Sequence, residues 1–555
     1  MKNPNKITIF LLLFIILAGI YLRVYNLDKP SFWVDELDFV YAAKSMSEVG
    51  RPLLNSGYPY SRAPLVTYSL MASFKLFGIS EFSARLPVAI FGVLSIPLLY
   101  LIGRSFFGKR VGLLAALFLT FSPLAIGLSR TCRMYSLFQF LFLAGVYFFY
   151  LGFEARDKSN NMAASRQRRI YFAPFTKILE RWQIHLPMLS LGGLFLLLAY
   201  ITHQNAGLFL LSLMGYLAAC WIFLSIKGGI KSFPTEKYVV PLGVIILMGL
   251  LAYLINPEVH NFIVHAVTYL PKWAEVDSAQ NPWLIFDFLF TSMETVPFNL
   301  LFVLGTLLLI VNKNKAGLYT LLTFWVPVLA FSFLFQYRKN DYIFHVFPIF
   351  FLVSAYALDR VIGFTHLIFA SWKSAQRISN KLTDSQFTNW LSTLLLLIWI
   401  PITPAFLFAQ KIPRLPDGHF NGAKYHNEWK QAADFLQDKL DQNDVIISTL
   451  PQTIQYYTGR AEYNLNWHYA DQARRSKIYA PDGCLIDFYS GADVIEDLDE
   501  LKTIFIRHRK GWIIVDNYRF RNPVYVPENI QQYLVNYVTK SFETKRGTVS
   551  IYRWN

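Results

Sequence analysis

The chain has 555 residues, of which 54% are hydrophobic and 17% aromatic. These proportions are too apolar for a soluble enzyme and are typical of a polytopic membrane protein. The formal net charge of +16 would also suit a nucleic-acid-binding protein, but the basic residues lie mainly in loops between apolar runs, so membrane topology explains the charge better. The scattered Cys132, Cys220 and Cys484 predict neither a zinc site nor a disulfide framework, although a bridge between Cys132 and Cys484 stays open.

Eleven apolar runs have about the length that spans a bilayer. The first has no small-residue cleavage site, so we expect a retained helix rather than a signal peptide. The sequence therefore predicts a multi-pass α-helical membrane protein with about eleven transmembrane helices, and the runs cover residues 7–25, 82–101, 111–128, 134–153, 186–202, 207–224, 238–255, 296–311, 318–335, 342–362 and 390–408.

Positive charge predicts the orientation of these helices. If the N-terminus is cytoplasmic, the loops rich in Lys and Arg alternate with loops that are poor in them, as the positive-inside rule requires. The protein then lies in the inner or plasma membrane, with residues 26–81, residues 256–295 and the C-terminal tail on the outer side. Both loops are aromatic and carry interspersed charges, so we expect segments that lie on the membrane around a site.

The tail has ordinary charge density and no run of membrane length. We therefore divide the chain into a transmembrane catalytic module, 1–410, and an extracytoplasmic α/β domain, 411–555. Within the tail, the pattern predicts an amphipathic helix over Trp429–Leu440 and buried strands over Asp444–Ser448 and Gly511–Asp516.

Two adjacent carboxylates, Asp35 and Glu36, follow the first apolar run. Apolar residues at helical spacing follow them, so both acids would lie at a helix N-terminus, where the helix dipole favours their ionised forms. A carboxylate there can accept a proton, act as a nucleophile or bind a metal. The alternative is that Asp35 only caps the helix and Glu36 is a first-turn acid.

Several cations occupy the predicted outer side, against the topological bias. Arg62 precedes Pro64 at the start of an amphipathic segment, and arginine suits bidentate phosphate binding. Anchoring at lipid headgroups is the competing explanation for these cations. The cations are Arg62, Arg85, Arg130, Arg133, Arg338 and Lys339.

Further polar residues on the outer side are candidates for substrate contact. His203 interrupts an apolar hairpin, although a lone histidine is more often a packing residue than a catalyst. Tyr135 and His345 begin helices beside the cationic segments. The spacing of His260 and His265 does not place them on one helix face, so we assign no metal to them.

The chain resembles the integral-membrane lipid-carrier-dependent glycosyltransferases of the GT-C superfamily. This group includes the protein O-mannosyltransferases of family 39 and the aminoarabinose transferases of lipid A. The resemblance covers roughly the first 360 residues and rests on Trp33–Glu36, Arg62–Leu65, Phe77–Gly78, Ala84–Pro87, Arg133–Leu137, Thr202–His203 and Arg338–Pro348.

The resemblance implies a hexosyl- or pentosyltransferase of the cell envelope. It would move a sugar from a polyprenyl-phosphate donor to a hydroxyl of a lipid, glycan or protein on the outer face. Asp35 would act as the general base, and the anomeric centre would be inverted. Where some relatives carry lysine before a Pro-Pro pair, this chain has Arg62 followed by Ala63 and Pro64. The resemblance implies that Arg62, Arg133, Arg338 and Lys339 bind the donor phosphate, and that Arg85, Arg130, Tyr135, His203 and His345 contact substrate.

Three questions stay open at this level. Glu36 would orient Asp35, join it in holding a divalent ion such as Mg²⁺ or Mn²⁺, or face water. A transporter or flippase of a lipid-linked substrate is the main alternative, but the charges cluster at one face and no internal repeat is visible. An anchored sensor is less favoured, since eleven spans exceed what an anchor requires.

Overall fold

The computed structural model describes residues 6–154, 181–228, 236–268, 281–292, 294–376, 427–467, 478–480 and 483–554. The chain divides into two compact units. We call one the helical unit (Met1–Leu22, Phe91–Ile126 and Tyr135–Ile412) and the other the mixed unit (Arg23–Ile90, Gly127–Met134 and Pro413–Asn555). The expected domain boundary at residue 410 lies outside the described residues and stays a prediction.

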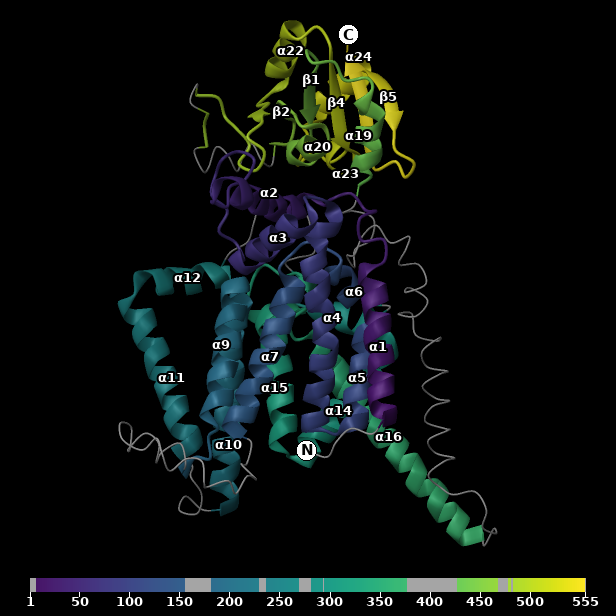
Figure 1. Cartoon of the computed structure of the whole chain (residues 1–555). Helices are drawn as coiled ribbons and strands as arrows, with labels where there is room; N and C mark the ends of the chain where they lie inside the picture. The colour runs from purple at the N-terminus through teal and green to yellow at the C-terminus, as the bar shows by residue number, and fades with distance from the viewer. Residues whose placement is uncertain are drawn as a thin grey trace. The chain divides into compact units, whose positions relative to one another are not determined.

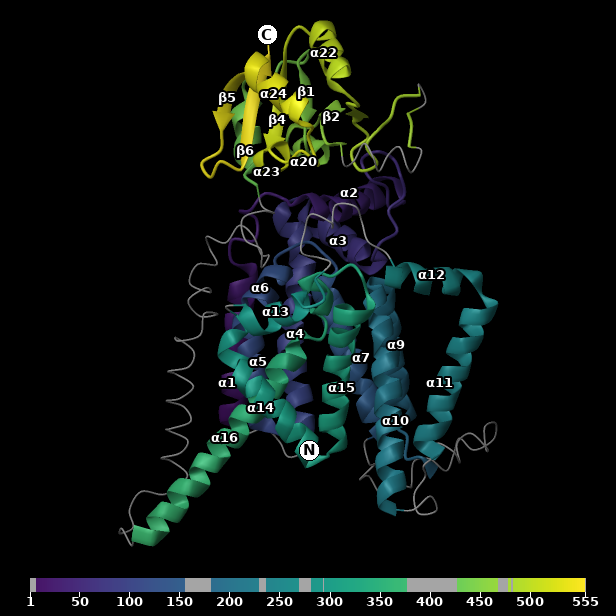
Figure 2. The same cartoon turned by 180° about the vertical axis from the view of Figure 1, so that it is seen from behind.

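Apolar helices make up the helical unit (Figures 1 and 2). Helices α1, α4 and α6 each have one end in this unit and the other in the mixed unit. The helices with residues in the unit are α1 (Lys6–Val24), α4 (Glu81–Phe106), α5 (Lys109–Phe121), α6 (Pro123–Ser129), α7 (Tyr135–Glu154), α9 (Leu186–Thr202), α10 (Leu208–Gly228), α11 (Glu236–Ile255), α12 (Pro257–Thr268), α13 (Leu284–Thr291), α14 (Val296–Asn312), α15 (Lys315–Leu329) and α16 (Phe347–Gln376), with short turns η1 (Gln204–Gly207), η4 (Ala330–Leu334) and η5 (Asn340–Ile343).

Within the described residues, 7 helices are long and apolar enough to cross a membrane, or up to 9 if each of two bent pairs is one span. The expectation of a multi-pass α-helical membrane protein is therefore confirmed. Helix α9, with 17 residues, is about 25 Å long, short of the roughly 30 Å bilayer core. The last of the eleven runs, 390–408, lies outside the described residues.

One expected span, 111–128, is not a single straight helix. Helices α5 and α6 meet at Ser122 with a bend of 63°. Ser122 has φ −64° and ψ 116°, an extended conformation. Pro123 explains this, because a proline disfavours helical geometry at the residue before it.

Glycine allows the close packing of α7 against α9, which lie side by side in Figure 1. A Cβ atom added to Gly152 would lie 2.3 Å from the backbone nitrogen of Leu189, and one added to Gly192 would lie 2.4 Å from that of Phe149. Small residues at such contacts let membrane helices approach closely, which increases dispersion contacts in lipid, where the hydrophobic effect contributes little.

The mixed unit contains a six-stranded sheet in the order β3-β2-β1-β4-β6-β5, whose strands from β5 to β2 follow one another across Figure 2. The first four strands in this order are parallel, and the pairs β4–β6 and β6–β5 are antiparallel. The expected tail strands and helix are confirmed. The strands are β1 (Val445–Ser448), β2 (Tyr463–Asn464), β3 (Asp493–Val494), β4 (Gly511–Asp516), β5 (Thr539–Glu543) and β6 (Val549–Trp554), and the tail helices are α19 (Trp429–Gln437), α20 (Pro451–Thr458), α22 (Leu498–Arg507), α23 (Asn517–Phe520) and α24 (Glu528–Tyr537).

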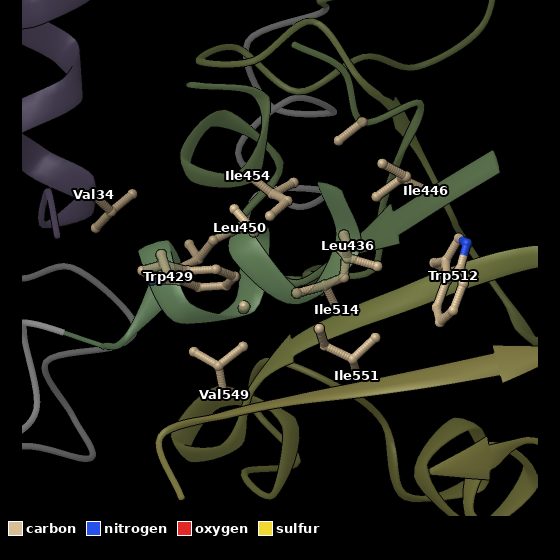
Figure 3. Packing of buried hydrophobic residues seen from close by; sticks show 13 residues of the cluster. Val34, Trp429, Leu436, Ile446, Leu450, Ile454, Trp512, Ile514, Val549 and Ile551 are labelled. Atoms are coloured by element: carbon tan, nitrogen blue, oxygen red, sulfur yellow. The ribbon is translucent and has the colours of Figure 1, made fainter. Parts of the chain in front are cut away.

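Side chains alternate across this sheet and form a core on each face. One core contains Val445 and Ile513 together with residues of α22 and α24. The other contains Trp429 of α19 and Ile454 of α20, and it also includes Val34, a residue more than 390 positions earlier in the chain. Figure 3 shows Val34 beside Trp429, Leu450 and Ile454. The tail therefore shares a hydrophobic core with the segment that carries Asp35 and Glu36.

Candidate functional site

The carboxylate pair lies in the first turn of helix α2 (Val34–Val49), as the sequence predicted. Trp33 is the residue before the helix, and its backbone N–H donates a hydrogen bond of 2.9 Å to Glu36 Oε2. Such a bond satisfies an N–H group that has no partner within the helix. Helix α2 continues into helix α3 (Pro64–Phe77) through a loop, and the two helices pack together.

Glu36 is completely buried and binds Arg85 in a bidentate pair. Arg85 Nε donates to Glu36 Oε1 at 2.9 Å, and Nη2 donates to Oε2 at 2.8 Å. The backbone N–H of Cys132 donates to Oε1 at 2.6 Å. Together with the bond from Trp33, these contacts occupy the roughly four acceptor positions of a carboxylate. Glu36 does not face water, which excludes one of the roles that the sequence left open.

Arg85 has partners for its other donors as well. They bind the backbone oxygens of Leu27 and Pro30 at 3.0 and 2.9 Å and that of Ser31 at 3.0 Å. These carbonyls belong to the loop that joins α1 to α2. The guanidinium of Arg85 thus binds both Glu36 and the loop before α2, and it holds this loop in place at the start of the helix.

Asp35 has a different environment from its neighbour. Its side chain is 37% exposed, and Arg133 Nη1 lies 3.2 Å from its Oδ2. The same Nη1 donates to the backbone oxygen of Asp35 at 3.1 Å, and the guanidinium lies over the rings of Trp33 and Phe39. Asp35 is therefore a solvent-accessible carboxylate next to a nearly buried cation.

Asp38 is a third carboxylate of this site, which the sequence analysis missed. It follows Asp35 by one helical turn and is only 6% exposed. Burial, and then the charge of Asp35, raise the pKa of Asp38 to about 8, while Arg133, Arg62 and a hydrogen bond from Gln452 act in the opposite direction. The i, i+3 spacing of the two aspartates was the available signal, because residues at this spacing share a helix face.

Arg62 is exposed and precedes α3, where Ala63 is left-handed, with φ 43° and ψ 59°, and Pro64 is the first helical residue. A left-handed non-glycine residue costs roughly 1–2 kcal/mol. The charge of Arg62 acts on Asp38 and on the buried Tyr60. The structure thus brings Asp35, Arg62 and Arg133 together around Asp38 in the mixed unit.

Arg130, in contrast, binds the backbone. It donates to the carbonyl oxygens of Arg23, Tyr25 and Asn26 at 3.3, 2.8 and 3.2 Å. Cations favour the carbonyl end of a helix, where the backbone dipoles leave partial negative charge. These bonds at the end of α1 account for an arginine on the predicted outer side, where cations are scarce. Cys132 forms no disulfide with Cys484.

The other predicted residues belong to the helical unit. His203 and His345 each stack on the ring of Phe138, at ring distances of 5.1 and 4.7 Å, and the ring of Tyr135 lies 6.3 Å from that of His203. The guanidinium of Arg338 donates to the backbone oxygens of Ser332 and Gln336 at 3.0 and 2.9 Å, and the Lys339 ammonium lies over the ring of Tyr337.

Comparison with known proteins supports the resemblance noted in the sequence. Residues 61–164 match the family described as Dolichyl-phosphate-mannose-protein mannosyltransferase. A Bacillus subtilis protein named "Putative mannosyltransferase YkcB" is 29% identical over 151 residues, which are 26% of this chain and 20% of that protein. The match thus spans about a fifth of the length of this relative.

Solved structures match over almost the whole chain. ArnT from Cupriavidus metallidurans bound to undecaprenyl phosphate has a TM-score of 0.58 at 14% identity, over 98% of this chain and 97% of that one. The chain has the ArnT fold. The oligosaccharyltransferase AglB from Archaeoglobus fulgidus, in complex with an inhibitory peptide and a dolichol-phosphate, has a TM-score of 0.59 at 13% identity, over 99% and 74% of the two chains.

The carboxylates of this ArnT-fold chain do not fit a metal shared by Asp35 and Glu36. The archaeal oligosaccharyltransferase has also been solved with zinc and sulfate. Here, the described ranges contain no group of three or more His, Cys, Asp or Glu side chains that could hold a metal ion. Glu36 would first have to give up its hydrogen bonds to Arg85 and to the backbone, and we derive no step through a metal.

Asp38→Asn should stabilise the protein, and more so at alkaline pH. Because folding raises the pKa of Asp38 from 3.8 to about 8, the native state binds the proton more tightly than the unfolded chain. The ionisation penalty is therefore absent below about pH 4, grows as the pH rises and is complete above about pH 8. We expect the gain in Tm to reach several degrees and to be larger at about pH 9 than at about pH 5.

Thermal unfolding in detergent at both pH values measures this gain. Glu48→Gln changes an exposed acid of the same helix and should leave Tm almost unchanged. An equal effect of Asp38→Asn at the two pH values would contradict the assignment of a raised pKa.

Proposed function

We propose that the protein is a glycosyltransferase that moves a sugar from a polyprenyl-phosphate donor to an acceptor hydroxyl. The observation that carries this proposal is the pairing of the accessible Asp35 with Arg133, beside Arg62, in a chain of the ArnT fold. The matching family and relative are named as mannosyltransferases, and the solved structures of similar fold have undecaprenyl phosphate or a dolichol-phosphate bound. Sugar transfer from a phosphate leaving group requires one base and several cations, and Asp35, Arg62 and Arg133 supply these groups here.

Asp35 acts as the general base in this proposal. Its carboxylate accepts the proton of the acceptor hydroxyl while the hydroxyl oxygen forms a bond to the anomeric carbon of the sugar. The bond between that carbon and the phosphate oxygen breaks, and its electron pair leaves with the polyprenyl phosphate. Direct displacement from the opposite side inverts the anomeric centre. A phosphate leaves without protonation, so no second carboxylic acid is required, in contrast to ordinary glycoside hydrolysis.

Arg62 and Arg133 stabilise the departing phosphate. Arginine can bind phosphate through two parallel hydrogen bonds, and such charge-assisted bonds are stronger than neutral ones. Because the pKa of Asp38 is raised to about 8, this carboxyl group is largely protonated and uncharged near pH 7. With Asp38 protonated, the two arginines leave a surplus of positive charge for the phosphate.

Glu36 and Arg85 position the base rather than react, because their hydrogen bonds are directed at each other and at the backbone. Arg130 has a similar role at the end of α1. Arg338 and Lys339 remain proposed phosphate ligands, and Tyr135, His203 and His345 remain proposed substrate contacts. We also retain the proposed orientation in the inner or plasma membrane, with a cytoplasmic N-terminus and an outer tail, as well as the proposed domain division.

Transfer of radiolabelled mannose from polyprenyl-phosphate mannose by the purified protein tests the function. Label should leave the donor and appear in an acceptor fraction, with free polyprenyl phosphate as the second product. A transporter would instead move intact donor between the leaflets of a proteoliposome. Movement without cleavage, for mannose and for other polyprenyl-phosphate sugars, would reject the proposal in favour of transport.

Arg62→Ala should raise the apparent KM for the lipid donor about tenfold, which corresponds to about 1.4 kcal/mol, and change kcat less. The reason is that an exposed phosphate ligand is lost while Asp35 and Arg133 stay in place. Arg62→Lys should restore part of the affinity, because the charge remains but the bidentate geometry does not.

Initial rates at varied donor concentration measure the effect. Arg51→Ala removes another exposed arginine of the same loop and should leave KM within about twofold. If Arg62→Ala and Arg51→Ala have the same donor KM, Arg62 is not a phosphate ligand.

A further inference from the structure

Gln452, in helix α20 of the C-terminal tail, contacts helix α2 at its first turn. Its side chain is buried, and Nε2 donates to the backbone oxygen of Val34 at 2.7 Å. The same Nε2 lies 3.4 Å from Asp38 Oδ1. The backbone oxygen of Gln452 accepts a hydrogen bond of 3.0 Å from the hydroxyl of Tyr41. One residue of the tail thus contacts Val34, Asp38 and Tyr41, which lie within the first two turns or so of α2.

A rigid support holds Gln452 in this position. It is the second residue of α20, after Pro451, and proline fixes the backbone at the start of a helix. Leu450 and Ile454, on either side of it, are buried in the core that also contains Val34 and Trp429 (Figure 3). Because α20 and the start of α2 share this core, the amide of Gln452 has little freedom to move away.

The same helix also holds the chain before α2. The hydroxyl of Tyr457 accepts a hydrogen bond of 2.8 Å from the backbone N–H of Phe32 and lies 3.0 Å from Glu81 Oε1. On α19, Lys430 donates from its backbone N–H to Ser31 Oγ at 3.0 Å and forms an ion pair with Glu81 at 2.9 Å. The tail therefore binds both sides of the turn that presents Asp35.

We propose that Gln452 is a positioning residue for sugar transfer, through which the C-terminal domain sets the position of the first turn of α2. This inference rests on the proposed function and extends it to the tail. The groups that face Asp38 are Asp35 from α2 itself, Tyr60 and Arg62 from the loop before α3, Arg133 from the 127–134 segment and the neutral amide of Gln452 from α20. In this proposal Gln452 contacts no reacting atom and acts by holding helix α2 in position.

Gln452→Ala tests the positioning. Gln455→Ala is the matched control, because Gln455 lies on the same helix but accepts a bond from Asn55 and donates to the backbone oxygen of Ala461. We expect Gln452→Ala to lower kcat about tenfold to hundredfold, since small displacements of a catalytic group carry such penalties, with donor KM within about twofold. Gln455→Ala should retain kcat within about twofold, at a similar Tm.

Glutamate substitutions add a readout that loss of structure alone does not produce. Gln452→Glu places a second negative charge next to Asp38, which favours the protonated carboxyl groups. The pH profile of kcat should therefore move to higher pH by at least half a unit. Gln455→Glu adds the same charge one turn away, beside Asn55, and should leave the profile in place.

Hydrogen exchange of peptides that cover residues 34–49 separates this inference from the proposed function. If the wild-type protein transfers no sugar from any lipid-phosphate donor, the proposed function fails, while faster exchange of α2 in Gln452→Ala than in Gln455→Ala still supports the positioning. Equal exchange in the two variants would overturn the positioning role. So would wild-type kcat in Gln452→Ala, or coincident pH profiles for the two glutamate variants.

Discussion

Asp35→Asn is expected to lower kcat for sugar transfer by a factor on the order of 10² to 10⁴, the usual contribution of a general base. The amide has the shape of the carboxyl group but does not accept the acceptor proton. The fold should survive, because the ion pair of Asp35 with Arg133 is partly exposed and such pairs contribute at most about 1 kcal/mol. Arg133 also keeps its bond to the backbone oxygen of residue 35. Labelled-sugar transfer at saturating donor measures the loss.

Asp28→Asn is the control for this variant. Asp28 is an exposed aspartate of the loop before α2, and its replacement should retain activity within about twofold. Comparable transfer by Asp35→Asn and the wild type, at equal Tm, would remove Asp35 as the base. The loss should appear in kcat rather than in donor KM, since the cations next to Asp35 are unchanged.

Local pattern was sufficient to predict much of the fold. Apolar runs of bilayer length identified the membrane helices, and the periodicity after Glu36 identified α2. The short buried strands of the tail were predictable for the same reason, because a run such as Gly511–Asp516 is apolar and β-branched and is buried on both faces of the sheet. Pro123 in the sequence also indicated the bend at Ser122, but the continuous apolar run led to the prediction of a single span over residues 111–128.

The different environments of the two adjacent carboxylates depend on contacts between residues far apart in the chain, which the sequence does not show. Glu36 and Asp35 are neighbours with the same type of side chain, yet one is fully buried on Arg85 and the other is accessible. The difference depends on Arg85, 49 residues later, and on the backbone at Cys132, 96 residues later. A single sequence contains no measure of such proximity.

Asp38 and Gln452 were missed for a related reason. Asp38 has the spacing of a helix face but appears in the sequence as one more polar residue of an amphipathic segment. Gln452 is 414 residues away from it, in a domain whose composition shows only a small α/β fold. Because the tail was interpreted as a separate domain, its hydrogen bonds to α2 were not predicted. Only the folded structure shows them.

Arg85→Met is expected to lower the free energy of unfolding by about 3–5 kcal/mol, the usual effect of removing one partner from a buried ion pair. The substitution leaves Glu36 buried with its charge uncompensated, and the backbone oxygens of Leu27 and Ser31 lose their donor. Arg51→Met, at an exposed position, should change stability by less than about 0.5 kcal/mol. Thermal unfolding of the purified protein in detergent should show a Tm lower by on the order of 10 °C for Arg85→Met.

The double variant Glu36→Gln with Arg85→Met separates the stranded charge from the lost packing. Removing both charges should recover part of the stability, so that the double variant is more stable than the sum of the two single changes by about 1–3 kcal/mol. Additive losses would mean that the ion pair has no coupling energy and that packing alone accounts for the effect. Because Glu36 also receives bonds from Trp33 and Cys132, the recovered protein should still transfer sugar more slowly than the wild type, since the turn that presents Asp35 is held less firmly.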